Sequence, residues 1–341
     1  MSGSGAARRG AADAPPAREG ARPGDDLRPA DRTGPQAPPP PDRLRAWLEL
    51  LRLSNAPTCV TNALVGIALG LAAATAAGDP GASAVTAGVL LRGVAAATAI
   101  LLLYGAGLVL NDLLDRAVDR RERPGRPIPS GRVSPRSAAI AAGAMGAAAL
   151  LLLGLASTAA LCFGAALAAA IVAYDLLHLR TAGAVVLMGA CRALIYPTSA
   201  AAIVWPIGWT WLAPAVGLGL YVALLSVVAR GEIGGERESP LRAAAMFLLP
   251  LVPLAAAAFV PSSSLLLALP FAMALVAWCQ WATSRCLAGP GRVGSAVAAW
   301  IAGIALIDAV YLALLNHTLL ALVALGAWAA TAAAQRRIAG S

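Results

Sequence analysis

The composition of this 341-residue chain excludes an ordinary soluble domain, because 59% of its residues are hydrophobic and only 13% are charged, against about 25% in typical soluble domains. The formal net charge of +9 comes entirely from arginine, since the sequence contains no lysine. Such an excess occurs in nucleic-acid-binding proteins, but arginines that flank membrane helices on the cytoplasmic side explain it better here. We therefore expect an integral membrane protein without a nucleic-acid partner.

The beginning of the chain differs in composition from the rest, because it is rich in Pro, Gly, Ala, Arg and Asp. Such a segment buries too little apolar area to offset the entropy of ordering, so residues 1–42 are expected to form a disordered cytoplasmic tail. No apolar run follows Arg8 and Arg9, which argues against a cleaved signal peptide. Residues 43–341 are expected to form one transmembrane domain.

Ten apolar segments follow this tail, each close to the ~20 residues that a helix needs to cross a bilayer. Their predicted spans are 56–77, 94–114, 138–156, 158–177, 183–204, 209–229, 242–260, 264–284, 295–314 and 318–335. Arginines gather in every second connection, which predicts that both termini and the charged loops face the cytoplasm of a bacterial cell. The predicted fold class is an all-α polytopic membrane protein, surrounded by membrane lipid.

The connection after the second segment concentrates the charge of the chain. It reads "NDLLDRAVDRRERPGRPIPSGR", from Asn111 to Arg132, and holds four carboxylates and six arginines. On a helix that advances ~100° per residue, Asn111, Asp112, Asp115 and Asp119 all point into one quadrant. Carboxylates four residues apart repel one another unless a cation lies between them. A set of oxygen ligands favours Mg²⁺, with Mn²⁺ as the second choice.

The arginines of the same stretch suit a phosphate that such a metal ion would share, since guanidinium binds phosphate in a bidentate manner. They are Arg116, Arg120, Arg123, Arg126 and Arg132. The alternative interpretation is a solvated, salt-bridged loop. The single-quadrant geometry at the end of a membrane helix favours the metal site.

This stretch resembles the first aspartate-rich motif of the UbiA superfamily of intramembrane prenyltransferases, N-D-x-x-D-x-x-x-D followed by R-P-[IL]-x-S-G. The resemblance extends along most of residues 43–315. "LRLSNAPT", with Arg52 and Asn55, is similar to the R-x-x-N element of the family's first helix. "YDLLHLR", with Tyr174, is similar to the family's tyrosine followed by basic residues. The resemblance implies a bundle of nine transmembrane helices, to which this chain adds a tenth at its C-terminal end.

The second acidic motif of the family departs from its usual form in this chain. "VVARGEIGGERES" keeps two carboxylates four residues apart, Glu232 and Glu236, but glutamate replaces aspartate and reaches one methylene further. Three glycines in this stretch favour a loop over a rigid helix. Together with the tenth helix, the pattern resembles the EboC-like branch of the superfamily.

The resemblance implies Mg²⁺-dependent transfer of a prenyl group from a prenyl diphosphate to a hydrophobic, aromatic or lipid-like acceptor, with release of pyrophosphate. The implied metal ligands and catalytic residues are Asn111, Asp112, Asp115, Asp119, Glu232 and Glu236. The implied substrate-binding residues are Arg52, Asn55, Arg123, Arg126, Tyr174, His178, Arg180, Arg192 and Arg230.

Three ionisable residues lie in or near the apolar segments, where such groups usually face the interior of the bundle or water. For Arg192, substrate binding and a structural pair between helices are both open interpretations. Asp308 fits a structural pair better, and Asp175 is expected to be solvated near the membrane interface.

Two rival functions also remain open. One is a protein that keeps this fold but has lost turnover, and that binds or transports a lipid or prenyl compound. The other is an intramembrane cyclase, which acts on the prenyl chain without an acceptor. CDP-alcohol phosphotransferases are disfavoured, because their D-G-x-x-A-R pattern is missing upstream of Asp115.

Overall fold

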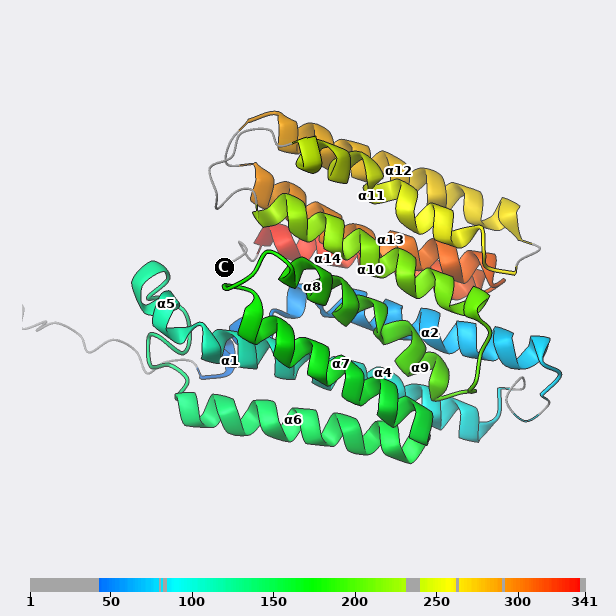
Figure 1. Ribbon diagram of the computed structural model, residues 1–341, viewed down its shortest axis with the longest axis horizontal. Helices are drawn as coiled ribbons and strands as arrows, with labels where there is room; N and C mark the ends of the chain where they lie inside the picture. The colour runs from blue at the N-terminus through cyan, green and yellow to red at the C-terminus, as the bar shows by residue number, and fades with distance from the viewer. Residues whose placement is uncertain are drawn as a thin grey trace, which may run out of the picture. The chain divides into compact units, whose positions relative to one another are not determined.

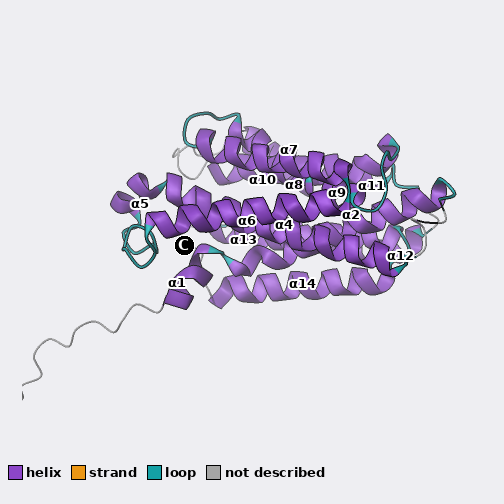
Figure 2. Cartoon of the chain, turned by 90° about the horizontal axis from the view of Figure 1, so that it is seen from below, coloured by secondary structure: helices purple, strands orange, loops and turns teal. Residues whose placement is uncertain are grey.

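The computed structural model describes residues 43–79, 81, 85–230, 240–261, 264–289 and 292–337, and these residues form helices and loops without a strand (Figure 2). The expected disordered tail at 1–42 lies outside the described residues, as do Glu232 and Glu236. The predicted all-α class is confirmed.

Ten long stretches of helix run side by side in one bundle (Figure 1). They are α2 (Ala56–Ala76), α4 (Ala87–Leu114), α6 (Pro135–Ala156), α7 (Thr158–Leu177), α8 with α9 (Ala184–Ala193 and Ile195–Ala201), α10 (Trp209–Arg230), α11 (Pro240–Ala257), α12 (Leu265–Leu287), α13 (Val293–Leu314) and α14 (Thr318–Arg337). Nine of the described stretches are long and apolar enough to cross a membrane, and the shorter apolar helix Arg242–Ala257 completes the ten that the sequence predicts.

The ends of several helices differ from the predicted spans for local reasons. The second segment begins at Ala87 rather than at 94, because the Thr86 hydroxyl caps the helix by accepting the Val89 N–H at 3.2 Å. The fifth segment is divided at Leu194 into α8 and α9. Two short helices, α1 (Arg43–Leu50) and α5 (Arg116–Glu122), lie at the same end of the bundle in both views and were not predicted.

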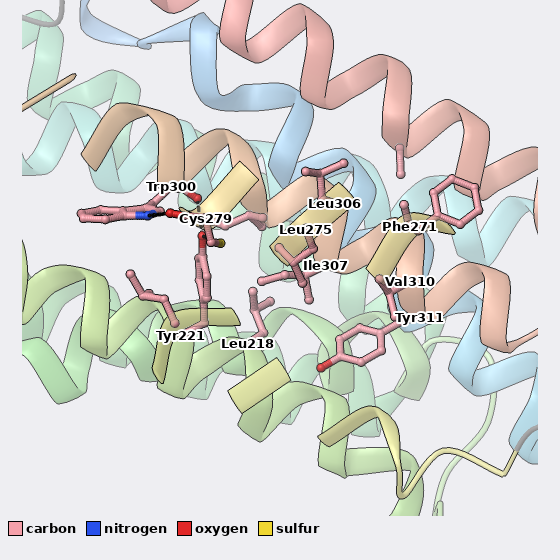
Figure 3. Packing of buried hydrophobic residues seen from close by; sticks show 14 of the residues in the cluster. Leu218, Tyr221, Phe271, Leu275, Cys279, Trp300, Leu306, Ile307, Val310 and Tyr311 are labelled. Atoms are coloured by element: carbon pink, nitrogen blue, oxygen red, sulfur yellow. Dashed lines mark hydrogen bonds between the residues drawn. The ribbon is translucent and has the colours of Figure 1, made fainter. Parts of the chain in front are cut away.

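The centre of the bundle is α13, which packs against α2, α10, α12 and α14. In its most apolar 18-residue stretch, 83% is buried inside the protein. Buried tyrosines tie it to its neighbours. The Tyr221 hydroxyl of α10 donates to the Trp300 carbonyl at 2.7 Å (Figure 3). The Tyr311 hydroxyl of α13 donates to the Pro253 carbonyl at 2.9 Å. Such bonds are needed because a membrane interior offers no water to buried polar groups.

Glycines allow α8 and α10 to pack backbone against backbone. A Cβ atom on Gly189 would lie only 2.5 Å from the Gly219 carbonyl oxygen. Because this contact involves backbone, we expect Gly189→Val to destabilise the bundle by about 1–3 kcal/mol. Gly146→Val is the matched control, since a Cβ there meets nothing within 4 Å. The thermal unfolding midpoint of each purified variant measures the effect, and equal midpoints for the two variants would contradict it.

Candidate functional site

A cavity of about 430 Å³ opens between α2, α4, α7, α8, α10 and α13. This volume lies within the ~300–1,000 Å³ usual for small-molecule sites. Much of its wall is apolar, with Leu103, Ile171, Met188, Leu225 and Ile304 among the lining residues. Its polar lining residues include Arg52, Asn55, Tyr104, Asn111, Tyr174, Asp175, Arg192, Ser226 and Arg230. The cavity therefore suits a molecule with a charged head and an apolar body.

The first acidic motif lies beside this cavity, where α4 ends at Leu114 and α5 begins at Arg116. Asp112 and Asp119 are buried, with 4% and 3% of their surface exposed. The Arg126 guanidinium lies between them, with Nη1 2.8 Å from Asp119 Oδ2 and 3.5 Å from Asp112 Oδ1. A cation therefore lies between these two carboxylates, and in this structure that cation is an arginine.

Arg52 forms the second ion pair of Asp112, with its Nη2 atom 2.8 Å from the same Oδ1. Its backbone is left-handed, with φ 40°, a conformation that costs a non-glycine residue about 1–2 kcal/mol. The Tyr104 hydroxyl donates to the Arg52 carbonyl at 3.2 Å, and this bond supports the turn. Arg52 therefore contributes both to the cavity wall and to the charge balance of the first motif.

Asp115 and Asn111 of the first motif contact the C-terminal end of α7. His178 Nε2 lies 3.2 Å from Asp115 Oδ2, and the His178 ring stacks on Tyr174 with 5.3 Å between centroids. The Asn111 amide donates to Asp175 Oδ1 at 3.2 Å. The Oδ2 atom of Asp175 is buried with no hydrogen-bond partner among the described residues. Asp175 is thus a cavity residue, and the expectation that it is solvated was wrong.

Arg230, the last described residue of α10, closes the other side of the cavity mouth. Its guanidinium donates to the backbone carbonyls of Thr181 (2.8 Å), Ala182 (2.9 Å) and His178 (3.0 Å). These carbonyls belong to the connection between α7 and α8, so Arg230 fixes that connection at the mouth. The second motif follows directly in the sequence, and its residues 231–239 lie outside the described part of the chain.

Helices α1 and α14 also make contacts near the cavity mouth. The Glu49 carboxylate of α1 lies 2.7 Å from Arg132 Nη2, and hydrogen bonding to Arg132 lowers the pKa of Glu49. This pair joins α1 to the loop that follows the first motif. From the other terminus, Gln335 of α14 donates its amide to Asn55 Oδ1 at 3.0 Å. The tenth helix therefore contacts a residue that lines the cavity.

The sequence-predicted site residues fall into four groups. Those that line the cavity are Arg52, Asn55, Asn111, Tyr174, Arg192 and Arg230. Those that contact or support the lining from behind are Asp112, Asp115, Asp119, Arg126 and His178. Arg123 and Arg180 are exposed and do not line the cavity. Glu232 and Glu236 lie outside the described residues.

The described residues contain no group of three or more His, Cys, Asp and Glu side chains that could hold a metal ion by themselves. Mg²⁺ commonly takes only one or two carboxylates and completes its shell with water and substrate phosphates. The buried Oδ2 atom of Asp175, which has no hydrogen-bond partner among the described residues, and the neighbouring Asn111 side chain supply oxygen donors that fit this mode of binding.

Parts of this chain are similar to known proteins. The profile of the UbiA prenyltransferase family matches residues 63–292. A digeranylgeranylglyceryl phosphate synthase from Methanothrix thermoacetophila is 50% identical over 58 residues, which cover 17% of this chain and 22% of that relative. The match therefore spans about a fifth of the relative's length.

Two solved structures have a similar fold. A structure of digeranylgeranylglyceryl phosphate synthase aligns with a TM-score of 0.53 and 17% identity, over 84% of this chain and 99% of the other. A UbiA homologue from Archaeoglobus fulgidus, bound to GPP and Mg²⁺, aligns with a TM-score of 0.50 and 13% identity, over the same shares of 84% and 99%. At these identities the similarity shows the fold alone.

Proposed function

This chain belongs to the UbiA prenyltransferase family, and from that premise we propose that it transfers a prenyl group from a prenyl diphosphate to a hydrophobic acceptor within the membrane, with Mg²⁺ as cofactor. The observation that carries the proposal is the cavity itself. Arg52, Arg230 and Asn111 of the acidic motif line its mouth, and much of its wall is apolar. The Archaeoglobus fulgidus homologue is bound to GPP and Mg²⁺, which supports the same classes of ligand here.

The first acidic motif, Asn111, Asp112, Asp115 and Asp119, would hold Mg²⁺ together with the diphosphate, and Glu232 and Glu236 would complete the site. When bound, the ion neutralises negative charge that develops on the leaving diphosphate. Arg52 and Arg230 line the mouth, where their remaining N–H groups orient the diphosphate oxygens.

The transfer itself breaks the bond between the allylic carbon and the diphosphate oxygen, and pyrophosphate leaves with the electron pair. A nucleophilic atom of the acceptor forms the new bond to that carbon and loses its proton. The apolar wall excludes water, which otherwise competes for the allylic cation. Tyr174, which stacks on His178 at the cavity wall, borders the region where the cation would form.

The arginine pattern further supports an orientation with both termini and the charged connections in the cytoplasm. The ends of α4 and α10 lie at the mouth of the cavity. So does Asn55, the last residue of the short helix η1 (Leu53–Asn55), which Gln335 of α14 contacts. The diphosphate would then enter from the cytoplasmic leaflet.

Release of pyrophosphate from geranyl diphosphate tests the proposal. The full chain, in membranes that supply the acceptor, should release pyrophosphate with Mg²⁺ present and stop when EDTA removes it. A protein that only binds or transports prenyl compounds would retain geranyl diphosphate without releasing pyrophosphate, and that result would overturn the enzymatic assignment. Product analysis separates transfer from cyclisation.

The contact from α14 leads to a prediction on substrate binding. Gln335→Ala removes a neutral hydrogen bond to Asn55, and such bonds contribute about 0.5–1.5 kcal/mol. We expect the KM for geranyl diphosphate to rise about two- to tenfold with kcat little changed. Leu322→Ala on the exposed face of the same helix is the control, with no expected change. A lower kcat at constant KM would argue against this role.

A further inference from the structure

The inner part of the cavity contains a cation that the mouth does not account for. Arg192 lies in α8, eight residues after the helix begins at Ala184, which corresponds to about 12 Å along the helix axis. Its half-buried side chain lines the cavity beside Cys59 of α2. A charged residue at this depth within a membrane span is expensive, so its surroundings must compensate for it.

Most of the hydrogen-bonding capacity of Arg192 is unused. Among the described residues, only its Nη1 atom makes hydrogen bonds, to Asn62 Oδ1 at 2.9 Å and to Cys59 Sγ at 3.4 Å. No carboxylate in the described ranges lies within 4.0 Å of it. A guanidinium group has five N–H donors. The Nε and Nη2 donors of Arg192 are therefore available to a molecule in the cavity.

The opposite charge lies behind the cavity wall. Asp308 of α13 is fully buried and accepts hydrogen bonds from Asn62 Nδ2 (2.9 and 2.8 Å), from the Tyr196 hydroxyl (2.6 Å) and from the Thr61 hydroxyl. The Asn62 amide thus donates to Asp308 and accepts from Arg192. This chain of bonds fixes the amide orientation and, through it, the position of the guanidinium.

This arrangement differs from a structural ion pair between helices, in which the two charges would lie in direct contact. Here an amide holds them apart, so that the negative charge faces the protein core and the positive charge faces the cavity. We propose that Arg192 forms a second oxyanion site that binds a phosphate or carboxylate group of the acceptor, and that Asn62 and Asp308 are its positioning residues. The inference rests on the proposed function, since it names the class of acceptor.

The position of Arg192 separates this site from that of the donor diphosphate. The mouth already brings Arg52, Arg230 and the acidic motif together, whereas Arg192 lies further along α8 among apolar lining residues. An oxyanion bound there belongs to a molecule that lies alongside the prenyl chain. The acceptor is accordingly an anionic amphiphile.

Equilibrium binding to the purified full chain in a neutral detergent tests the site. The probes are octyl phosphate and its uncharged counterpart 1-octanol. Each is measured with the mouth occupied by Mg²⁺ and geranyl S-thiolodiphosphate, a donor analogue whose allylic carbon–sulfur bond does not break. Arg192→Gln should weaken octyl phosphate binding about tenfold, because a charge-assisted bond is lost, and leave 1-octanol binding unchanged. Asn62→Ala should weaken octyl phosphate binding about threefold, because the guanidinium loses its fixed position.

Thr61→Val is the matched control, since it removes a hydrogen bond to Asp308 without touching the link between Asn62 and Arg192. Its octyl phosphate affinity should equal that of the unaltered chain. The unfolding midpoint of each variant shows whether it is folded, and Arg192→Lys provides a second variant that keeps the charge.

Octyl phosphate binding that is unaffected by Arg192→Gln overturns the proposal. So does a variant that loses affinity only for geranyl S-thiolodiphosphate, because the oxyanion at Arg192 would then be the donor's diphosphate. Binding requires no turnover, so the proposed activity can fail independently. A chain that binds octyl phosphate through Arg192 but releases no pyrophosphate from geranyl diphosphate would keep this site and lose the enzymatic assignment.

Discussion

Asp115→Asn should lower Mg²⁺-dependent release of pyrophosphate by about 100- to 1,000-fold, the range seen when one group that stabilises developing charge is removed. The substitution keeps the shape of the side chain and removes its negative charge from the proposed metal site. Asp115 also lies 3.2 Å from Nε2 of His178, the residue that caps the end of α7. Release from geranyl diphosphate, measured across a range of Mg²⁺ concentrations, gives the effect.

Glu122→Gln is the control for this experiment, because Glu122 is an exposed carboxylate of the same stretch that the family motif does not include. It should leave release within a factor of two, as surface charges usually do. If Asp115→Asn releases pyrophosphate as fast as the unaltered chain, the metal site does not involve the first acidic motif.

Arg126→Met should cost about 3–5 kcal/mol of stability, because it leaves two buried carboxylates without their shared cation. Asp119 loses its 2.8 Å ion pair, and Asp112 keeps only the pair with Arg52. The unfolding midpoint in detergent measures the loss. Arg123→Met is the matched control, since Arg123 is an exposed arginine three residues earlier in the same loop and should change the midpoint little.

The same pair of variants separates two roles for Arg126. The sequence suggests a diphosphate ligand, whereas the structure surrounds the guanidinium with Asp112 and Asp119. A stable Arg126→Met variant that has lost pyrophosphate release would support the first role. A variant with an unchanged midpoint and unchanged release would contradict both.

Much of the bundle could be predicted from the sequence, because apolar length alone defines a membrane span. Apolar length does not detect short, charged helices. It missed α1 and α5, which are charged and lie outside the apolar segments. It also ran through Leu194, an apolar residue at which α8 gives way to α9. Helix starts depended on single hydroxyl caps such as Thr86, which a hydropathy pattern does not register.

The candidate site was predictable as a set of residues but not as a set of partners. Residue types and spacing identified the acidic motif, and the family resemblance added Arg52, Asn55 and Tyr174. That Arg126 returns to lie between Asp112 and Asp119 depends on how the following loop folds. The burial of Asp175 was not predicted, because a carboxylate at a helix end is usually solvated. The packing of α7 against α4 brings this side chain to Asn111.

The way α1 docks has a consequence for how the domain responds to change at its beginning. Asp112 forms a 2.8 Å ion pair with Arg52, which lies 60 residues earlier in the sequence. Glu49 of α1 forms a second ion pair with Arg132, in the loop that follows the motif. Two ion pairs therefore connect the segment before the first span to the acidic motif and to the loop that follows it. A partner or modification that displaces α1 would break these ion pairs and shift the acidic residues without contacting them.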